Sequence, residues 1–160
     1  DIFGENDVLG TDISTFGLTN GKRGNTASMT PWSGFRMDDN CKEMVFIVEF
    51  DEPTTVSKVV FGSLYNPASV ILPPSVATIE TSSDGQKYSK DAEASFKRNY
   101  PERGRKAFTD TLAFEPREVT YLKVTLQNGG TLRNGIDFVK DPGSKEVVQA
   151  NLYLDEIEVY

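Results

Sequence analysis

Alternating apolar and polar positions recur along the chain and predict β-strands. The clearest case places Met44, Phe46, Val48 and Phe50 on one face of a strand. No long segment has a helical period, and a helical turn is predicted only near residues 91–96. The predicted strands cover residues 44–50, 55–61, 75–81, 106–114, 121–126 and 152–160.

Turn residues separate these strands, notably at residues 51–53, 83–85 and 128–130. Several short strands with such punctuation are typical of an antiparallel sandwich or barrel. We find neither an internal repeat nor a linker-like composition, so residues 1–160 are predicted to form a single domain. Two polar segments, at residues 20–42 and 128–149, are too long for tight turns. Such loops often carry function, although the second is equally well interpreted as a solvated insertion.

Composition removes several classes of function. The 160 residues carry a net charge of −7, which argues against binding a phosphate backbone or an anionic membrane surface. No apolar run is long enough to span a membrane. There is no histidine, so a Ser-His-Asp triad and a His-containing zinc site are both excluded. Cys41 is the only cysteine, and we interpret it as a structural thiol, since no histidine can activate it.

The chain opens on Asp1 and shows no signal peptide. We therefore expect it to be a processed or excised piece of a longer protein. Acidic pairs such as Asp155 and Glu156 raise the alternative of a small hydrolase. Pairs of this kind arise by chance among 24 Asp and Glu residues, and none is singled out, so catalysis is not expected.

Two local clusters have chemistry of their own. In the turn at residues 18–24, glycines permit positive φ, so carbonyl oxygens can face a common point and form a hard-cation site with Asn20 and Glu156. The alternative is an ordinary turn with a surface glutamate. Trp32, Phe35 and Arg36 form an aromatic-basic cluster that suits a sugar ring, or else the two aromatics plug the sandwich.

Five segments, taken in order, resemble one known family. They are residues 18–24 (Leu-Thr-Asn-Gly, then Gly24), 32–35 (Trp-Ser-Gly-Phe), 72–88 (from Leu-Pro-Pro-Ser-Val to Ser-Asp-Gly-Gln-Lys-Tyr), 121–124 (Tyr-Leu-Lys-Val) and 154–159 (Leu-Asp-Glu-Ile-Glu-Val). Their order and spacing resemble discoidin, or coagulation factor 5/8 type C, domains over nearly the whole chain. The version most similar is the family 32 carbohydrate-binding module attached to bacterial glycoside hydrolases.

The resemblance implies an all-β, antiparallel jelly-roll β-sandwich of galactose-binding-like type. It also implies a structural calcium ion, held by the carbonyls of Leu18 and Arg23, the Asn20 side chain and Glu156. Relatives usually carry Asp where this chain has Asn20. One negative charge fewer predicts weaker calcium affinity.

The resemblance further implies a glycan site in loops at one end. Relatives often have a Trp before the Leu-Pro pair and a Trp-His pair before the last strand, and residues 69–71 and 132–138 contain neither. Tyr65 or Phe138 is the expected substitute platform. Tyr100, Arg103 and Arg105 also fall in predicted loops or at their edges. The expected ligand-binding residues are Trp32, Phe35, Arg36, Tyr65, Asn66, Arg133 and Phe138.

The predicted function is a non-catalytic carbohydrate-binding module, an accessory domain of an exported bacterial glycoside hydrolase. Its expected partners are a glycan and the catalytic domain of the parent protein, with neither nucleic acid binding nor membrane insertion. Its expected location is extracellular, periplasmic or on the cell surface. The alternative is a structural or protein-protein interaction module that binds no sugar.

Overall fold

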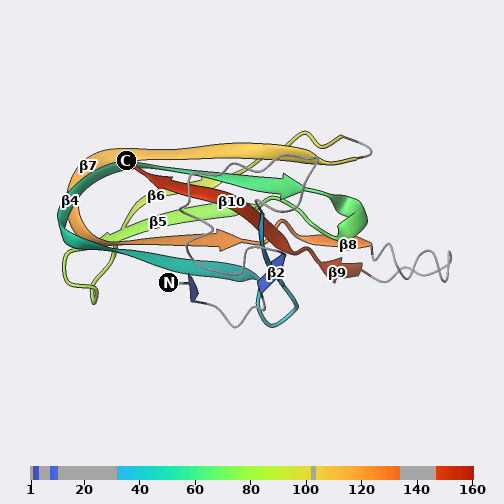
Figure 1. Cartoon of the computed structure of the whole chain (residues 1–160), viewed down its shortest axis with the longest axis horizontal. Coiled ribbons are helices and arrows are strands. Elements are labelled where there is room, and N and C mark those ends of the chain that lie inside the picture. The colour runs from blue at the N-terminus through green and yellow to red at the C-terminus, as the bar shows by residue number, and fades with distance from the viewer. Residues whose placement is uncertain (1, 4–7, 11–31, 102–103, 134–146) are drawn as a thin grey trace.

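In the computed structural model, two long strands, β4 (Glu43–Tyr65) and β7 (Lys106–Gln127), form an antiparallel ribbon that folds back on itself. The register shifts twice along this ribbon, once around Pro53 and once around Pro116. Proline has no N–H to donate, so it is tolerated where the ladder is already interrupted. Figure 1 shows both strands curling over together at the left of the molecule.

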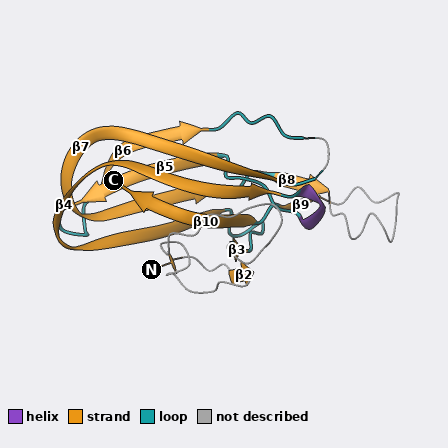
Figure 2. Ribbon diagram, turned by 45° about the horizontal axis from the view of Figure 1, so that its top comes forward, coloured by secondary structure: helices purple, strands orange, loops and turns teal. Residues whose placement is uncertain are grey.

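The folded ribbon gives the domain two layers (Figure 2). The first half of β4 and the second half of β7 lie in one layer with β5 (Val76–Ser82) and β6 (Ser89–Ser95). The other halves lie with β10 (Leu152–Val159), β3 (Ser33–Phe35) and β2 (Val8–Gly10). Every pair of strands is antiparallel among the residues described. The predicted antiparallel jelly-roll β-sandwich is confirmed.

The structure describes residues 2–3, 8–10, 32–101, 104–133 and 147–160. β1 (Ile2–Phe3) pairs with the first half of β4, and β8 (Thr131–Arg133) and β9 (Val147–Gln149) form a separate two-stranded sheet. A 3₁₀ turn, η2 (Pro67–Ser69), follows β4. Within the described ranges, no helix is long and apolar enough to cross a bilayer.

The strand predictions are largely confirmed, with two changes of boundary. The segments predicted at 44–50 and 55–61 are one strand, β4, because residues 51–53 bend the chain and do not end the ladder. β7 likewise joins the two strands predicted at 106–114 and 121–126. The helical turn predicted at 91–96 is wrong. That segment is strand β6, which pairs with β5 at the edge of the sheet.

The core lies between the two layers and follows the predicted alternation. Leu122, Val124 and Leu126 are fully buried, as expected for the inward face of a strand. Met44 and Phe46 are buried opposite them in β4, whereas Val48 and Phe50, nearer the bend, are half-buried. A second, smaller cluster combines Trp32, Leu64 and Ile71 with Tyr153.

Candidate functional site

Several connecting segments gather at the end of the sandwich opposite the β4/β7 bend, which we call the loop end. Figure 1 shows η2, the small sheet of β8 and β9, and the connection from β6 to β7 meeting there. Loops positioned by a rigid sandwich are the usual place for recognition. Side chains at the loop end are therefore the candidates for ligand recognition.

An aromatic stack lies at the loop end. Tyr65, the last residue of β4, and Tyr100, in the β6–β7 connection, stack in parallel with ring centroids 4.4 Å apart and an interplanar angle of 4°. Tyr100 and Phe108 lie edge to face, with ring centroids 5.8 Å apart and an interplanar angle of 89°. Tyr65 is 7 % exposed and its hydroxyl donates to the Pro101 carbonyl over 3.1 Å, whereas Tyr100 remains 40 % exposed. Tyr65 thus supports an aromatic ring that is itself open to solvent.

The electrostatics of Tyr100 favour a neutral phenol. Its partial burial raises the pKa of its hydroxyl above the ordinary tyrosine value, an effect that Arg98 partly offsets. The hydroxyl therefore keeps its proton at neutral pH. A neutral tyrosine offers an apolar ring face and a hydroxyl that can donate and accept hydrogen bonds.

Arg98 fixes the segment that carries Tyr100. Its guanidinium donates to both carboxylate oxygens of Asp110, at 3.1 and 2.8 Å, and to the Pro74 carbonyl at 3.0 Å. It also lies 4.4 Å from the Phe96 ring centroid and 5.1 Å from that of Phe108. The Arg98 side chain is only 6 % exposed, so this is a buried two-pronged ion pair. The β6–β7 connection is consequently anchored to β7 just before Tyr100.

A polar hollow of about 750 Å³ lies between the connection that precedes β4 and the end of β7. Gln149 donates to Asp39 over 3.0 Å and accepts from Asn128 over 2.7 Å. Among the described residues, the lining of this hollow includes no aromatic side chain. It offers hydrogen bonds without a stacking surface. The lining residues are Asp39, Asn40, Cys41, Lys42, Glu43, Ser75, Gln127, Asn128, Gly129 and Gly130.

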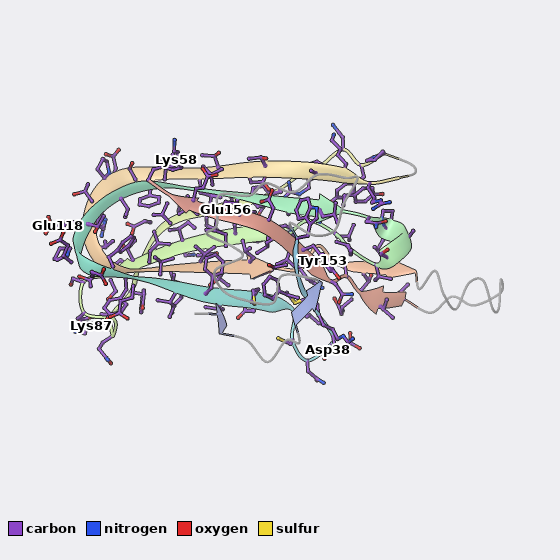
Figure 3. The ribbon with its side chains drawn as sticks, viewed as in Figure 1. Asp38, Lys58, Lys87, Glu118, Tyr153 and Glu156 are labelled. Carbon is purple, nitrogen blue, oxygen red and sulfur yellow. The ribbon has the colours of Figure 1, made fainter. Side chains whose placement is uncertain are left out.

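The predicted aromatic-basic cluster is not a binding surface in this structure. Trp32 and Phe35 are both 0 % exposed, Phe35 in the main core and Trp32 in the smaller cluster. The packing alternative describes them correctly, because Phe35 belongs to β3, which pairs with β10, and Trp32 directly precedes that strand and packs against Leu64 and Ile71. Arg36, directly after β3, is exposed. Burial raises the pKa of Tyr153, which Figure 3 labels on β10, and the charge of Arg36 partly offsets that rise.

The other predicted ligand residues fall into two groups. Tyr65 and Asn66 lie at the loop end, where Asn66 donates from Nδ2 to the Ser69 hydroxyl over 3.2 Å. Tyr65 is not itself the platform, because it is buried behind Tyr100. Arg133 is the last residue of β8. Phe138 lies outside the described residues.

Only one of the predicted calcium ligands lies within the described part of the chain. Leu18, Asn20 and Arg23 fall outside it. Glu156 is buried in β10, at the bulge between Leu154 and Ile157, and its backbone N–H donates to the carboxylate of the preceding aspartate. No group of three or more His, Cys, Asp or Glu that could hold a metal occurs among the described residues. The calcium site therefore stays a prediction.

The sequence reading missed Arg98, Lys106 and Phe108. A signal for them exists in the alternation of Phe96, Arg98 and Tyr100, in which aromatic and basic residues share one face of an extended segment. Lys106 and Phe108 repeat that pattern at the start of β7. The alternation places these aromatic and basic residues on one face of their segment, but it does not show which neighbouring strand they contact.

Comparisons with known proteins place this fold. The chain resembles CBM32-3 of a family 31 glycoside hydrolase from Clostridium perfringens, with a TM-score of 0.51, 14 % identity and coverage of 81 % of this chain and 74 % of that one. It is also similar to the CBM32 of AlyQ in complex with 4,5-unsaturated mannuronic acid, with a TM-score of 0.51, 12 % identity and coverage of 96 % and 93 %. This is the fold of family 32 carbohydrate-binding modules.

A third structure with this fold contains CBM32-1 and CBM32-2 of Clostridium perfringens ZmpB in complex with GalNAc. It matches with a TM-score of 0.51 and 15 % identity, over 97 % of this chain and 32 % of that one. No protein-family model matches the chain, and none of the curated proteins matches it either. The likeness is therefore one of fold, at identities of 12–15 %.

Proposed function

We propose that this domain is a non-catalytic carbohydrate-binding module whose sugar stacks on Tyr100. The observation that carries the proposal is the exposed Tyr100 ring, supported from behind by Tyr65 at the loop end of the sandwich. The apolar face of a pyranose covers a flat aromatic ring, and the adjacent polar groups orient its hydroxyls. Asn66, beside Tyr65, is the predicted ligand residue best placed for such a bond.

The rigidity of the platform supports this role. The Tyr65 hydroxyl holds Pro101 and the Arg98 ion pair holds the chain two residues before Tyr100, so little ordering is required when a ligand binds. A single exposed ring offers one shallow subsite. We therefore expect a Kd on the order of mM to tens of μM.

The proposal also covers the parent protein of the domain and the place where it acts. It acts as an accessory domain of an exported bacterial glycoside hydrolase, bringing the catalytic domain to a glycan outside the cytoplasm. One structural neighbour is a module of a family 31 glycoside hydrolase, and another structure, that of the CBM32 domains of ZmpB, contains GalNAc.

The test is a glycan array on the isolated domain in calcium-containing buffer, followed by titration of the hits against two variants. Tyr100→Ala is expected to weaken binding at least about tenfold and, because it also removes the stack on Tyr65, to lower stability by about 1 kcal/mol without unfolding the domain. Tyr160→Ala is the matched control, since it removes another exposed tyrosine, at the C-terminus. Equal affinity of wild type and Tyr100→Ala for every hit would overturn the proposed site. The absence of any glycan ligand would overturn the function.

A further inference from the structure

Charge is distributed very unevenly along this chain. Residues 96–108 carry five of the 17 Lys and Arg residues but one of the 24 Asp and Glu residues. The chain as a whole has a net charge of −7, so the remainder is strongly acidic. The basic residues are therefore concentrated in the segment that presents Tyr100.

Not all of these cations are available to a ligand. Arg98 is bound to Asp110 and is 6 % exposed, so its charge is already compensated. Arg105 and Lys106, by contrast, are exposed. Within the described residues, neither of them forms an ion pair with a carboxylate. Among the residues that the structure describes, these two cations therefore have no carboxylate partner at the start of β7.

Lys106 lies beside the aromatic stack. Its partner across the β4–β7 ladder is Tyr65, and Phe108 lies two residues further along its own strand, so the three side chains share one face. The Lys106 ammonium is 4.9 Å from the Phe108 ring centroid. Phe108 in turn lies edge to face with Tyr100, so Phe108 links the Lys106 ammonium to the exposed ring.

We infer that the sugar bound at Tyr100 is acidic, with its carboxylate or sulfate group paired to Lys106. This inference rests on the proposed function and names the class of its ligand. A neutral sugar would gain nothing from this cation. The acidic remainder of the domain repels a long polyanion. The recognised unit is therefore a single acidic residue at a chain end or branch.

The first test compares ligands that differ only in charge. An oligogalacturonate trimer, its fully methyl-esterified counterpart and a sulfated galactose disaccharide are titrated into the labelled domain and followed by NMR. The free acid is expected to bind at least about fivefold more tightly than its ester at low salt. That difference shrinks as salt screens the pair. The sulfated probe distinguishes a sulfate-bearing ligand from a carboxylate-bearing one.

The second test removes the charge from the protein. Lys106→Gln is expected to weaken binding of the acidic probe about two- to fivefold and to leave the ester unaffected. Lys87→Gln makes the same change in net charge far from the loop end, at the lower left of Figure 3, and is expected to leave both affinities unchanged. Because both lysines are exposed, neither substitution threatens folding.

The outcomes separate the inference from the function beneath it. Equal, Tyr100-dependent binding of acid and ester would overturn the acidic specificity and leave the sugar-binding function standing. Equal losses for Lys106→Gln and Lys87→Gln would overturn the role of Lys106. If neither these probes nor any glycan on the array binds, the proposed function and the inference fall together.

Discussion

Asp155 of β10 packs its carboxylate directly over Gly62 of β4, in the space that any side chain at position 62 would need. The contact is possible because β10 bulges between Leu154 and Ile157 where it crosses β4. Asp155 is buried and its Oδ1 accepts the backbone N–H of Glu156. The bulge, the glycine and the buried carboxylate therefore depend on one another.

This dependence predicts the effect of a single methyl group. Gly62→Ala is expected to destabilise the domain by about 1–3 kcal/mol, because Asp155 must move and weaken its bond to the Glu156 N–H. Urea denaturation measures the loss. Asp155→Ala should be less harmful in the Gly62→Ala background than in the wild type, since the clash is then absent. Strictly additive effects of the two substitutions would contradict the proposed contact.

The buried Arg98–Asp110 pair makes a second prediction. Arg98→Met leaves the Asp110 carboxylate, 13 % exposed, without its cation, and the expected loss is about 3–5 kcal/mol. Arg98→Met with Asp110→Leu removes both charges and should recover much of that loss. Lys90→Met is the control, because it breaks the exposed pair with Glu93 and should leave the unfolding midpoint nearly unchanged. Similar midpoints for Arg98→Met and Lys90→Met would show that the buried pair is unimportant.

The turn after β5 predicts a pH dependence. Asp84 accepts backbone N–H groups from Lys87 and Gln86, at 2.9 and 2.8 Å, and these bonds hold the pKa of its carboxyl below the ordinary value of 3.8. A carboxyl with a lowered folded-state pKa stabilises the fold above its unfolded-state pKa and loses that contribution as pH falls through its folded-state pKa. The contribution is thus present at neutral pH and disappears in acid.

Asp84→Ala tests this linkage. The variant should be less stable than the wild type at pH 7, and the difference should shrink steadily below about pH 4. Denaturant titrations at a series of pH values measure it. Asp51→Ala, at the exposed bend of β4, changes the net charge equally and serves as the control. A stability difference that stays constant down to pH 2 would assign the effect of Asp84 to something other than its charge.

The strands could be predicted where one face of the sheet is buried and the other is not, because the sequence then alternates between apolar and polar residues. Leu122, Val124 and Leu126 alternate because one face is core and the other is not. The segment at 91–96 misled because Ala92 and Ala94 favour a helix locally, whereas pairing with β5 decides the outcome. Pro53 correctly indicated that the chain changes direction, but the sequence alone does not distinguish a bend within a strand from the end of a strand.

The candidate site was harder to predict because its parts come together only in the fold. Trp32 and Phe35 lie close together in the sequence and looked like a platform, yet both are buried, Phe35 within β3 and Trp32 just before that strand. Tyr65 and Tyr100 are 35 positions apart, and their stacking depends on where the β6–β7 connection returns. No local pattern encodes that return. The clustering of basic residues near Tyr100 was visible in the sequence, but its meaning requires the stack.

The calcium prediction rests on the buried Glu156 and on residues outside the described ranges. If calcium binds only the folded state, then calcium at 100 times its Kd should stabilise the domain by about 2.7 kcal/mol, or about 5–10 °C in Tm. Thermal unfolding with and without calcium measures the shift, with magnesium as the control ion. Glu156→Gln should abolish the shift, whatever its own effect on Tm.

The Asn20→Asp variant distinguishes a calcium site of low affinity from the absence of a calcium site. Placing a carboxylate at this position adds one negative charge to the proposed ligand set, so the calcium-dependent shift should appear at a lower calcium concentration. Asn40→Asp makes the same change of charge at an exposed position outside the set and should leave the calcium dependence unaltered. If neither the wild type nor Asn20→Asp responds to calcium, then Glu156 is buried for structural reasons alone. A calcium-dependent shift in Tm that occurs only in Asn20→Asp would mean that Asn20 lowers the calcium affinity of the site below the concentrations tested.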